Sequence, residues 1–156
     1  MWRIASLFWL IVGLGVNDAR RSIGTRWQIW TYTPLKEHAA TDARVFIVLY
    51  NDNGLQSRPL ELDNFHLNDF QEGALDHFVV DDLINFSEVC GIRIFHDNGG
   101  LSPGWYLETL KVRMKGGTMR RTRDFGVNRW VGTEPEERGA DRIIMRTPEC
   151  SEGRLP

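Results

Sequence analysis

Short runs in which apolar and polar residues alternate with a period of two dominate the chain from residue 27 onward. Clusters of Gly, Asn, Asp and Pro separate these runs, and no long segment carries the apolar stripe of an amphipathic helix. Alternation of this kind sends successive side chains to opposite faces of a strand. It predicts seven strands and a possible eighth near residues 58–62; the seven are 27–32, 43–50, 76–80, 89–95, 105–114, 119–125 and 142–145.

This succession of short strands favours an all-β fold, an antiparallel β-sandwich. The run from Val45 to Tyr50 is apolar at every position, so we expect a central strand that is covered on both faces. With 156 residues, the chain is long enough for one hydrophobic core and too short for two. A net charge of −2 gives no general attraction to nucleic acid, which is therefore not expected as a partner.

The first 19 residues have the form of a secretory signal peptide. One basic residue, Arg3, precedes thirteen uncharged and mostly apolar residues, 4–16. This run is shorter than the roughly 20 residues that a membrane-spanning helix needs. We therefore expect residues 1–19 to be removed, a secreted domain at 24–146 and a polar tail at 147–156. The alternative is a buried N-terminal strand or helix.

Two features gain meaning if the protein is secreted. Cys90 and Cys150, the two cysteines of the chain, would close one disulfide in an oxidising compartment. The alternative is a buried thiol at Cys90 and an exposed one at Cys150, and the sequence leaves both open. Asn85, which Phe and Ser follow, is an acceptor sequon for N-glycosylation.

A hairpin is predicted where a Gly-Gly pair interrupts the alternation between residues 114 and 119. With a two-residue turn, Lys111, Arg113 and Lys115 share one face with Arg120, and Arg113 lies opposite Arg120. Like charges in that position repel, so the face would accept an anion such as a lipid phosphate or a sulfated sugar. The alternative is an ordinary solvated face.

The same register carries Arg121 and Arg123 to the apolar face of the hairpin. Either a bulge shifts the register, or these guanidinium groups reach a carboxylate such as Glu108 or Asp124.

No motif of catalysis is found in the sequence. Its four histidines occur without an HExxH pattern or cysteine spacing for zinc, and there is no Gly-rich phosphate loop or GxSxG elbow. No pair of carboxylates has the spacing and apolar setting of a general acid and base. We therefore expect a protein that is not an enzyme.

In one segment, residues 91–112, a polar turn is followed by a strand that begins with aromatic residues. Asp97 and Asn98 follow His96, and a turn that gathers such oxygen atoms can hold a hard cation. Trp105 comes after the turn at the start of an apolar strand. We expect Trp105 to lie in the core.

Together these segments resemble the PLAT family, the lipoxygenase-homology (LH2) domain of lipoxygenases, pancreatic-type lipases, clostridial alpha-toxin and polycystins. The resemblance covers residues 27–145. It is carried by residues 40–43, 45–50, 68–73, Asp76, Phe78, Ile92, Ile94, 96–98, 104–107, Phe125 and 128–130. It implies a C2-like sandwich of two four-stranded sheets.

The resemblance also implies calcium ligands in loops at one end of the sandwich. They would be Asp42 with carbonyls near His38 and Ala40, then Asn68, Asp69 and Gln71, and also Asp97 and Asn98. A glutamine at position 71, where lipoxygenases offer a glutamate, removes one negative charge and lowers the expected affinity. The alternative is that these turn-forming residues make only local hydrogen bonds.

Membrane contact would involve Trp130, which is retained from the lipoxygenase pattern, Leu101, and the hairpin cations Lys111, Arg113, Lys115 and Arg120. Glu37 and His38 replace the exposed aromatics of the first loop. The resemblance favours a non-catalytic module that binds membrane lipid with the help of calcium. The alternatives are an extracellular protein-interaction domain without lipid or calcium dependence, and a piece of a larger lipoxygenase-like or lipase-like enzyme. The sequence does not indicate an oligomeric state.

Overall fold

The computed structural model describes residues 26–51, 54–81, 89–115, 122–132 and 142–147. These ranges hold eight β-strands: β1 (Arg26–Tyr32), β2 (Val45–Asn51), β3 (Leu60–Leu62), β4 (Leu75–Val80), β5 (Val89–His96), β6 (Trp105–Lys115), β7 (Thr122–Val131) and β8 (Arg142–Arg146). All the strands that the alternation predicts are present, including the possible eighth. Within the described ranges, no helix has the length and apolar character needed to cross a membrane.

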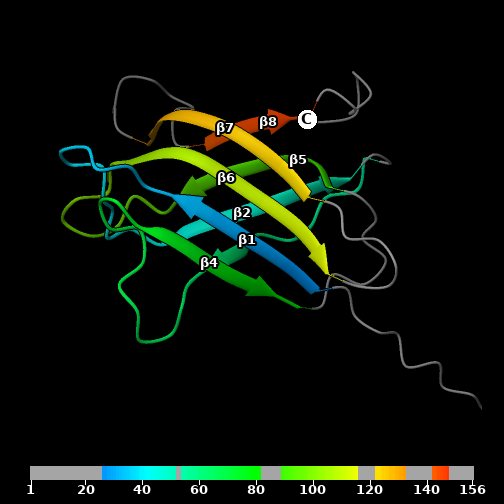
Figure 1. Cartoon of the computed structure of the whole chain (residues 1–156), viewed down its shortest axis with the longest axis horizontal. Coiled ribbons are helices and arrows are strands. Elements are labelled where there is room, and N and C mark those ends of the chain that lie inside the picture. Colours follow the sequence, from blue (N-terminus) through cyan, green and yellow to red (C-terminus); the bar gives the residue numbers. More distant parts are fainter. Residues whose placement is uncertain (1–25, 52–53, 82–88, 116–121, 133–141, 148–156) are drawn as a thin grey trace, which may run out of the picture.

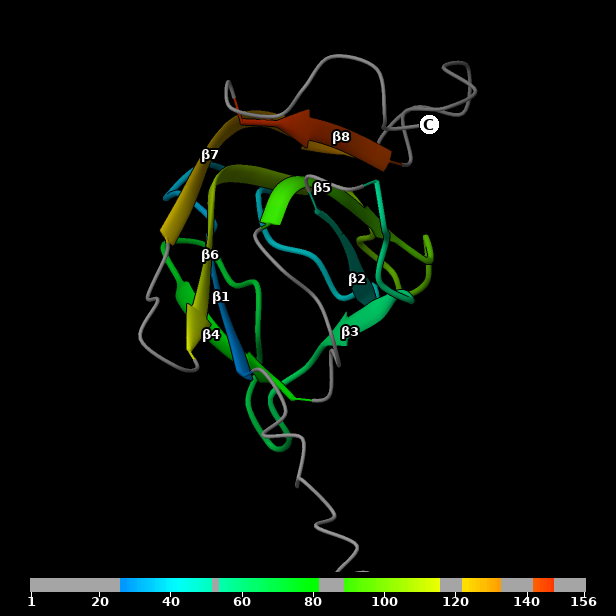
Figure 2. The ribbon, with the colours of Figure 1, turned by 90° about the vertical axis from the view of Figure 1, so that its right-hand side faces the viewer.

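The strands form two four-stranded antiparallel sheets, which confirms the predicted β-sandwich. The strand order is β4-β1-β6-β7 in one sheet and β3-β2-β5-β8 in the other. Figure 1 shows the first sheet nearly face-on, and Figure 2 shows the two sheets as facing layers.

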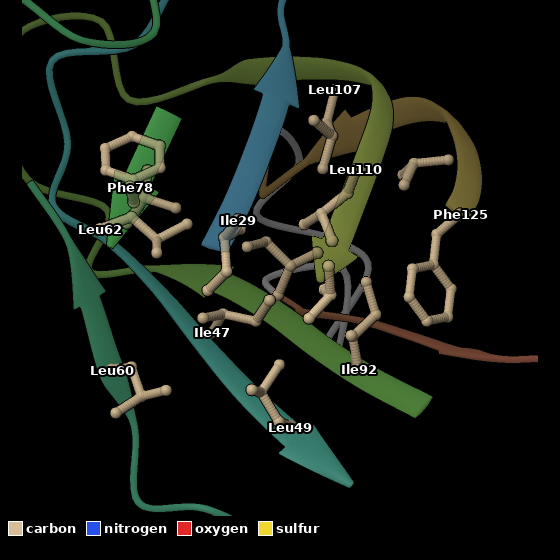
Figure 3. Close-up of a cluster of buried hydrophobic side chains, with 14 of the residues drawn as sticks. Ile29, Ile47, Leu49, Leu60, Leu62, Phe78, Ile92, Leu107, Leu110 and Phe125 are labelled. Atoms are coloured by element: carbon tan, nitrogen blue, oxygen red, sulfur yellow. The ribbon is translucent and has the colours of Figure 1, made fainter. Parts of the chain in front are cut away.

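The hydrophobic core lies between the two layers. Ile29 on β1 and Leu110 on β6 meet Ile47 and Leu49 on β2 and Ile92 on β5, and all five are 0–1% exposed (Figure 3). Strand β2 is buried at six of its seven positions, because it is central in its sheet and its outer face is also covered. The prediction of a central strand at 45–50 is confirmed.

The predicted register of the β6–β7 hairpin is wrong by two residues. Arg113 lies opposite Thr122 instead of Arg120, and Lys111 lies opposite Asp124, with Nζ and Oδ1 3.3 Å apart. The observed pairing replaces a repulsive Arg–Arg contact by an ion pair. An even shift keeps every side chain on its own face, so the hydrophobic pattern cannot distinguish the two registers.

The residues that follow in β7 also differ from the prediction. The strand runs to Val131, six residues past the expected end, across a bulge opposite the segment 107–109. Arg123 does face inward, where its Nε lies 3.3 Å from the carbonyl oxygen of Val89. Its guanidinium group therefore reaches a backbone oxygen of β5.

Three loops leave the sandwich at one end. Tyr32 at the end of β1 lies opposite Leu75 at the start of β4, and Val45 at the start of β2 lies opposite Leu62 and His96 at the ends of β3 and β5. The connections 33–44, 63–74 and 97–104 therefore gather at this end, on the left of Figure 1. We call it the loop end.

Several predictions involve residues outside the described ranges. These are the signal peptide at 1–19, the sequon at Asn85, Arg120 and Arg121, Cys150 and all but the first residue of the tail at 147–156. Cys90 is disulfide-bonded, which agrees with the first of the two alternatives for the cysteines.

The core position of Trp105 can be tested by truncation. Its side chain is 0% exposed and its Nε1 donates a hydrogen bond of 2.9 Å to the hydroxyl of Thr33. We expect Trp105→Ala to lower the free energy of unfolding by about 3–5 kcal/mol in a denaturant titration. The control is Leu101→Ala at a fully exposed position, where a change within about 0.5 kcal/mol is expected. Equal effects of the two substitutions would contradict the assignment.

Candidate functional site

Backbone hydrogen bonds connect the first loop to its neighbours. The amide of Thr41 donates to the carbonyl of Phe70 in the second loop at 3.4 Å, and the amide of Asp42 donates to the carbonyl of Ser102 in the third loop at 3.4 Å. Hydrogen bonds therefore connect the first loop to both of the other loops.

The carboxylate of Asp42 holds the third loop. It accepts the N–H of Leu101 at 2.7 Å and the N–H of Ser102 at 2.9 Å. These two hydrogen bonds lower the pKa of Asp42. Gly100 has φ +80°, and a Cβ there would stand 2.3 Å from an Asp42 carboxylate oxygen. Only glycine therefore lets the loop approach this closely.

The turn after β5 is fixed by two further side chains. Asp97 accepts the N–H of Gly99 at 2.9 Å and that of Arg44 at 3.1 Å, and these hydrogen bonds lower its pKa. His96 is buried; its Nδ1 accepts the N–H of Asn98 at 2.9 Å, and its Nε2 lies 2.8 Å from the carbonyl of Val131. This arrangement requires the tautomer with the proton on Nε2.

Acidic side chains order the second loop in the same way. Asp69 accepts both the backbone N–H and the side-chain amide of Asn64, at 2.7 and 2.9 Å. Asp76 accepts the N–H of Phe70 at 2.8 Å, and its partial burial raises its pKa. Gln71 donates from Nε2 to the carbonyl of Asp69 at 3.3 Å, which leaves its amide oxygen as a possible cation ligand.

An acidic cavity of about 190 Å³ lies between the first and second loops. Three of the predicted ligands, Asp42, Asn68 and Asp69, line it together. Two further acids that the sequence reasoning missed, Glu61 and Asp63, also line it. Glu61 lies in the short strand β3 and Asp63 follows it. Only the pairing of β3 with the start of β2 shows that both acids lie beside the first loop.

One cation, Arg44, shares the wall of this acidic cavity. It forms two hydrogen bonds with Glu61, from Nε to Oε1 at 2.7 Å and from Nη2 to Oε2 at 2.8 Å. Asp63 makes no hydrogen bond or ion pair with any residue that the structure describes.

The donor set of the cavity suits a hard cation. Carboxylate oxygens and the amide oxygen of Asn68 are the ligands that calcium prefers, and a carboxylate that accepts one hydrogen bond on each oxygen keeps lone pairs for a metal. No three His, Cys, Asp or Glu side chains converge on one metal position among the described residues. The chemistry therefore fits calcium, while binding would require the loops to draw the oxygens closer.

The other predicted ligands lie outside the cavity lining. His38 is well exposed, with Nε2 3.4 Å from a carboxylate oxygen of Glu37. The lining also leaves out Ala40, Gln71, Asp97 and Asn98. Three of the eight predicted ligands, Asp42, Asn68 and Asp69, therefore line the cavity, and the other five do not.

Exposed apolar side chains lie on the three loops of the loop end, and one of them, Leu67, lines the acidic cavity. Leu101, predicted as a membrane contact, is 100% exposed. Three others that the sequence reasoning missed are Leu35 at 85%, Phe65 at 83% and Leu67 at 69%. Phe65 and Leu67 occur as isolated apolar residues in the polar stretch 63–69, which was the available signal.

Trp130 is held in place at the edge of this end. Its ring meets that of Tyr106 edge-on at 5.4 Å, and Nζ of Lys36 lies 3.8 Å from the Tyr106 ring centre and 5.2 Å from that of Trp130. It is half-buried, so less of its surface is open to a partner than at Leu101.

Three of the predicted hairpin cations, Lys111, Arg113 and Lys115, lie away from the loop end. Lys115 follows Trp105 by ten positions along β6, which at about 3.3 Å per residue is about 33 Å. Lys111 and Arg113 lie along the same strand. The structure therefore does not bring these cations together with Leu101 and Trp130.

A β-sandwich of two four-stranded sheets with an acidic cavity among the loops at one end defines a C2-like domain. The model of the PLAT/LH2 domain matches residues 27–144, and the chain belongs to this family. Among its relatives, Polycystin-1-like protein 3 of Mus musculus is 33% identical over 131 residues. Lipoxygenase homology domain-containing protein 1 of Mus musculus is 30% identical over 117 residues. The matched regions are 84% and 75% of this chain but only 6% and 5% of those proteins.

Solved structures show the same fold. A coral 8R-lipoxygenase, described as activated by calcium through a C2-like domain, matches with a TM-score of 0.63 and 24% identity over 78% of this chain and 16% of its own. A calcium-dependent 11R-lipoxygenase matches with a TM-score of 0.60 and 22% identity, over 78% of this chain and 17% of its own.

Because the carboxylate of Asp42 holds the third loop through two hydrogen bonds, we expect the order of that loop to depend on pH. Because its pKa is lowered in the folded protein, its stabilising effect is complete above the ordinary aspartate pKa of about 3.9 and is lost as the pH falls through the lower folded value. We expect the amides of Leu101 and Ser102 to be protected from hydrogen exchange at neutral pH and to lose that protection in acid.

The measurement is amide exchange by NMR, expressed as protection factors. Asp42→Asn is the control, because its side chain does not titrate in this range and should remove the pH dependence. Protection of both amides that persists far below the aspartate pKa would contradict the assignment.

Proposed function

We propose that the domain is a secreted, non-catalytic module that binds membrane lipid through its loop end with the help of calcium. One observation carries the proposal: four strongly exposed apolar side chains, Leu35, Phe65, Leu67 and Leu101, sit on the three loops around an acidic cavity.

The two parts of the loop end serve different steps of binding. Four carboxylates against one guanidinium make the cavity repel anionic headgroups, so a bound divalent cation would remove this repulsion and contact the phosphates. The apolar side chains would then enter the interface, where full burial of a Leu or Phe contributes about 1.5–3 kcal/mol. Cation and apolar contacts together give reversible binding.

Two further observations support the proposal. The coral 8R-lipoxygenase and the 11R-lipoxygenase, which share this fold, are described as calcium-activated and calcium-dependent. The disulfide bond at Cys90 suits a protein outside the reducing cytosol.

A second function is interaction with an extracellular protein. The cluster of Lys36, Tyr106 and Trp130 favours it, because fixed aromatic rings beside a cation are typical of the residues that dominate protein interfaces. Lipid binding that is absent under all conditions below would favour this function.

Sedimentation with anionic vesicles tests the apolar contacts. We expect the wild-type domain to pellet with vesicles in calcium and to stay in the supernatant with a chelator, and the double variant Phe65→Ser, Leu101→Ser to lose at least about tenfold in affinity, because two apolar side chains no longer enter the interface. Leu55→Ser is the control, because Leu55 is 57% exposed but lies outside the three loops. Equal losses in both variants would reject the loop end as the contact.

Calcium titration by calorimetry tests the cavity. We expect Asp63→Asn to weaken calcium binding severalfold without unfolding the loops, because this carboxylate lines the cavity and makes no bond within the described chain. Glu72→Gln is the matched control: it removes one charge from the same loop, at an exposed residue outside the lining. Identical titrations of both variants and the wild type would exclude the cavity as the calcium site.

A further inference from the structure

A groove of about 590 Å³ lies on the outer face of the sheet β4-β1-β6-β7, within the range of about 300–1,000 Å³ typical of ligand clefts. The register explains its composition. Trp30 on β1 lies opposite Lys111 on β6, and Lys111 lies opposite Asp124 on β7. In the next row, Thr109 on β6 lies opposite Gly126 on β7. This face is turned toward the viewer in Figure 1.

The indole of Trp30 forms one wall. Its ring stacks on the ring of His77 at 4.7 Å with an interplanar angle of 17°, and Gln28 Nε2 lies 3.3 Å from His77 Nε2. Trp30 lines the groove whereas His77 does not. One face of the indole is therefore covered by His77, while the ring borders open space on its other side.

The opposite wall carries charge. Arg113 and Lys111 line the groove together with a single carboxylate, Asp124, which is already paired with Lys111. Arg113 has no ion-pair partner among the described residues. The exposed Lys115 lies two residues further along β6. The groove is thus positively charged, with an unpaired guanidinium available for an anion.

The floor is open because of a glycine. A Cβ placed on Gly126 would meet only the amide nitrogen of Asn128, at 3.5 Å, which is an ordinary contact. A side chain could therefore be carried here, and it would project into the groove. A glycine in the interior of a strand weakens the strand, and such a residue often marks a bulge or the close approach of a ligand. A bulge in β7 follows Gly126 directly, and the groove above Gly126 leaves room for a ligand to approach the backbone.

We infer that this groove binds an acidic saccharide, a sugar ring that carries a sulfate or carboxylate group. The negative face of the indole attracts the C–H bonds of a sugar ring, and Arg113 and Lys111 would bind the acidic group. The hydroxyls of Thr109 and Thr122 would pair with sugar hydroxyls. Leu75 and Phe125 also line the groove, so that hydrogen-bond donors and acceptors alternate with apolar surface in a concavity, which matches a polyhydroxylated ring better than a flat membrane surface.

The test uses a heparin-derived tetrasaccharide, with its fully desulfated form as a comparison. We expect the tetrasaccharide to bind at low ionic strength, to shift the indole N–H signal of Trp30 in NMR spectra, and to bind at least about tenfold more tightly than the desulfated form. Arg113→Gln and Trp30→Ala should each weaken binding by about tenfold or more. Arg58→Gln, which removes an exposed arginine outside the groove, should bind like the wild type.

A second variant fills the groove without removing any side chain. Gly126→Val should abolish tetrasaccharide binding while the thermal midpoint stays unchanged or rises, because a β-branched residue suits a strand. This result holds even if Trp30→Ala fails to fold. Unaltered binding by Gly126→Val, or equal binding by Arg113→Gln and Arg58→Gln, would overturn the inference.

The groove and the loop end are distinguished by vesicle sedimentation. Gly126→Val should pellet with calcium and anionic vesicles like the wild type, so failure of the saccharide site would leave the membrane proposal intact. Loss of vesicle binding in this variant, with no tetrasaccharide binding by the wild type, would show that the groove takes lipid phosphate and would overturn the inference.

Discussion

The buried indole of Trp105 sets the geometry of the loop end. Its N–H donates to the hydroxyl of Thr33, the residue that opens the first loop, and its ring meets that of Phe70 in the second loop edge-on at 4.9 Å. Trp105 itself closes the third loop as the first residue of β6. One side chain therefore anchors all three loops to the core, so the positions of the acidic cavity and of the exposed apolar side chains depend on the packing beneath them.

The carboxylates of the loop end have two tasks that draw on the same oxygens. Asp42 and Asp69 each accept two hydrogen bonds that hold loop residues in place, and both also line the cavity. The alternative of local hydrogen bonds and that of metal ligation are thus compatible for these residues. Asp63 lines the cavity but makes no hydrogen bond with any described residue. Its substitution therefore tests metal ligation without removing a hydrogen bond that orders the loops.

Much of the fold could be predicted from the sequence because period-two alternation is a local signal. It located every strand, the central position of β2 and the burial of Trp105. The register of the β6–β7 hairpin could not be derived, since a shift of two residues leaves the alternation unchanged and only the structure shows that Lys111 lies opposite Asp124. Asp42, Asn68 and Asp69, which the resemblance implies as calcium ligands, line one cavity, and their role as ligands stays a prediction. Glu61 and Asp63 were missed because their role depends on the pairing of β3 with β2, a contact between distant segments.

The arginine in the acidic cavity has a thermodynamic consequence. Arg44 is part of the wall, so unlike a dissolved ion it neutralises Glu61 without losing translational freedom and cannot be diluted away. A monovalent cation offers the carboxylates no more charge than this tethered group already supplies. A divalent ion is attracted to the same oxygens about twice as strongly as a monovalent one, so the built-in counter-ion lowers the affinity for every cation while a divalent ion keeps the larger attraction.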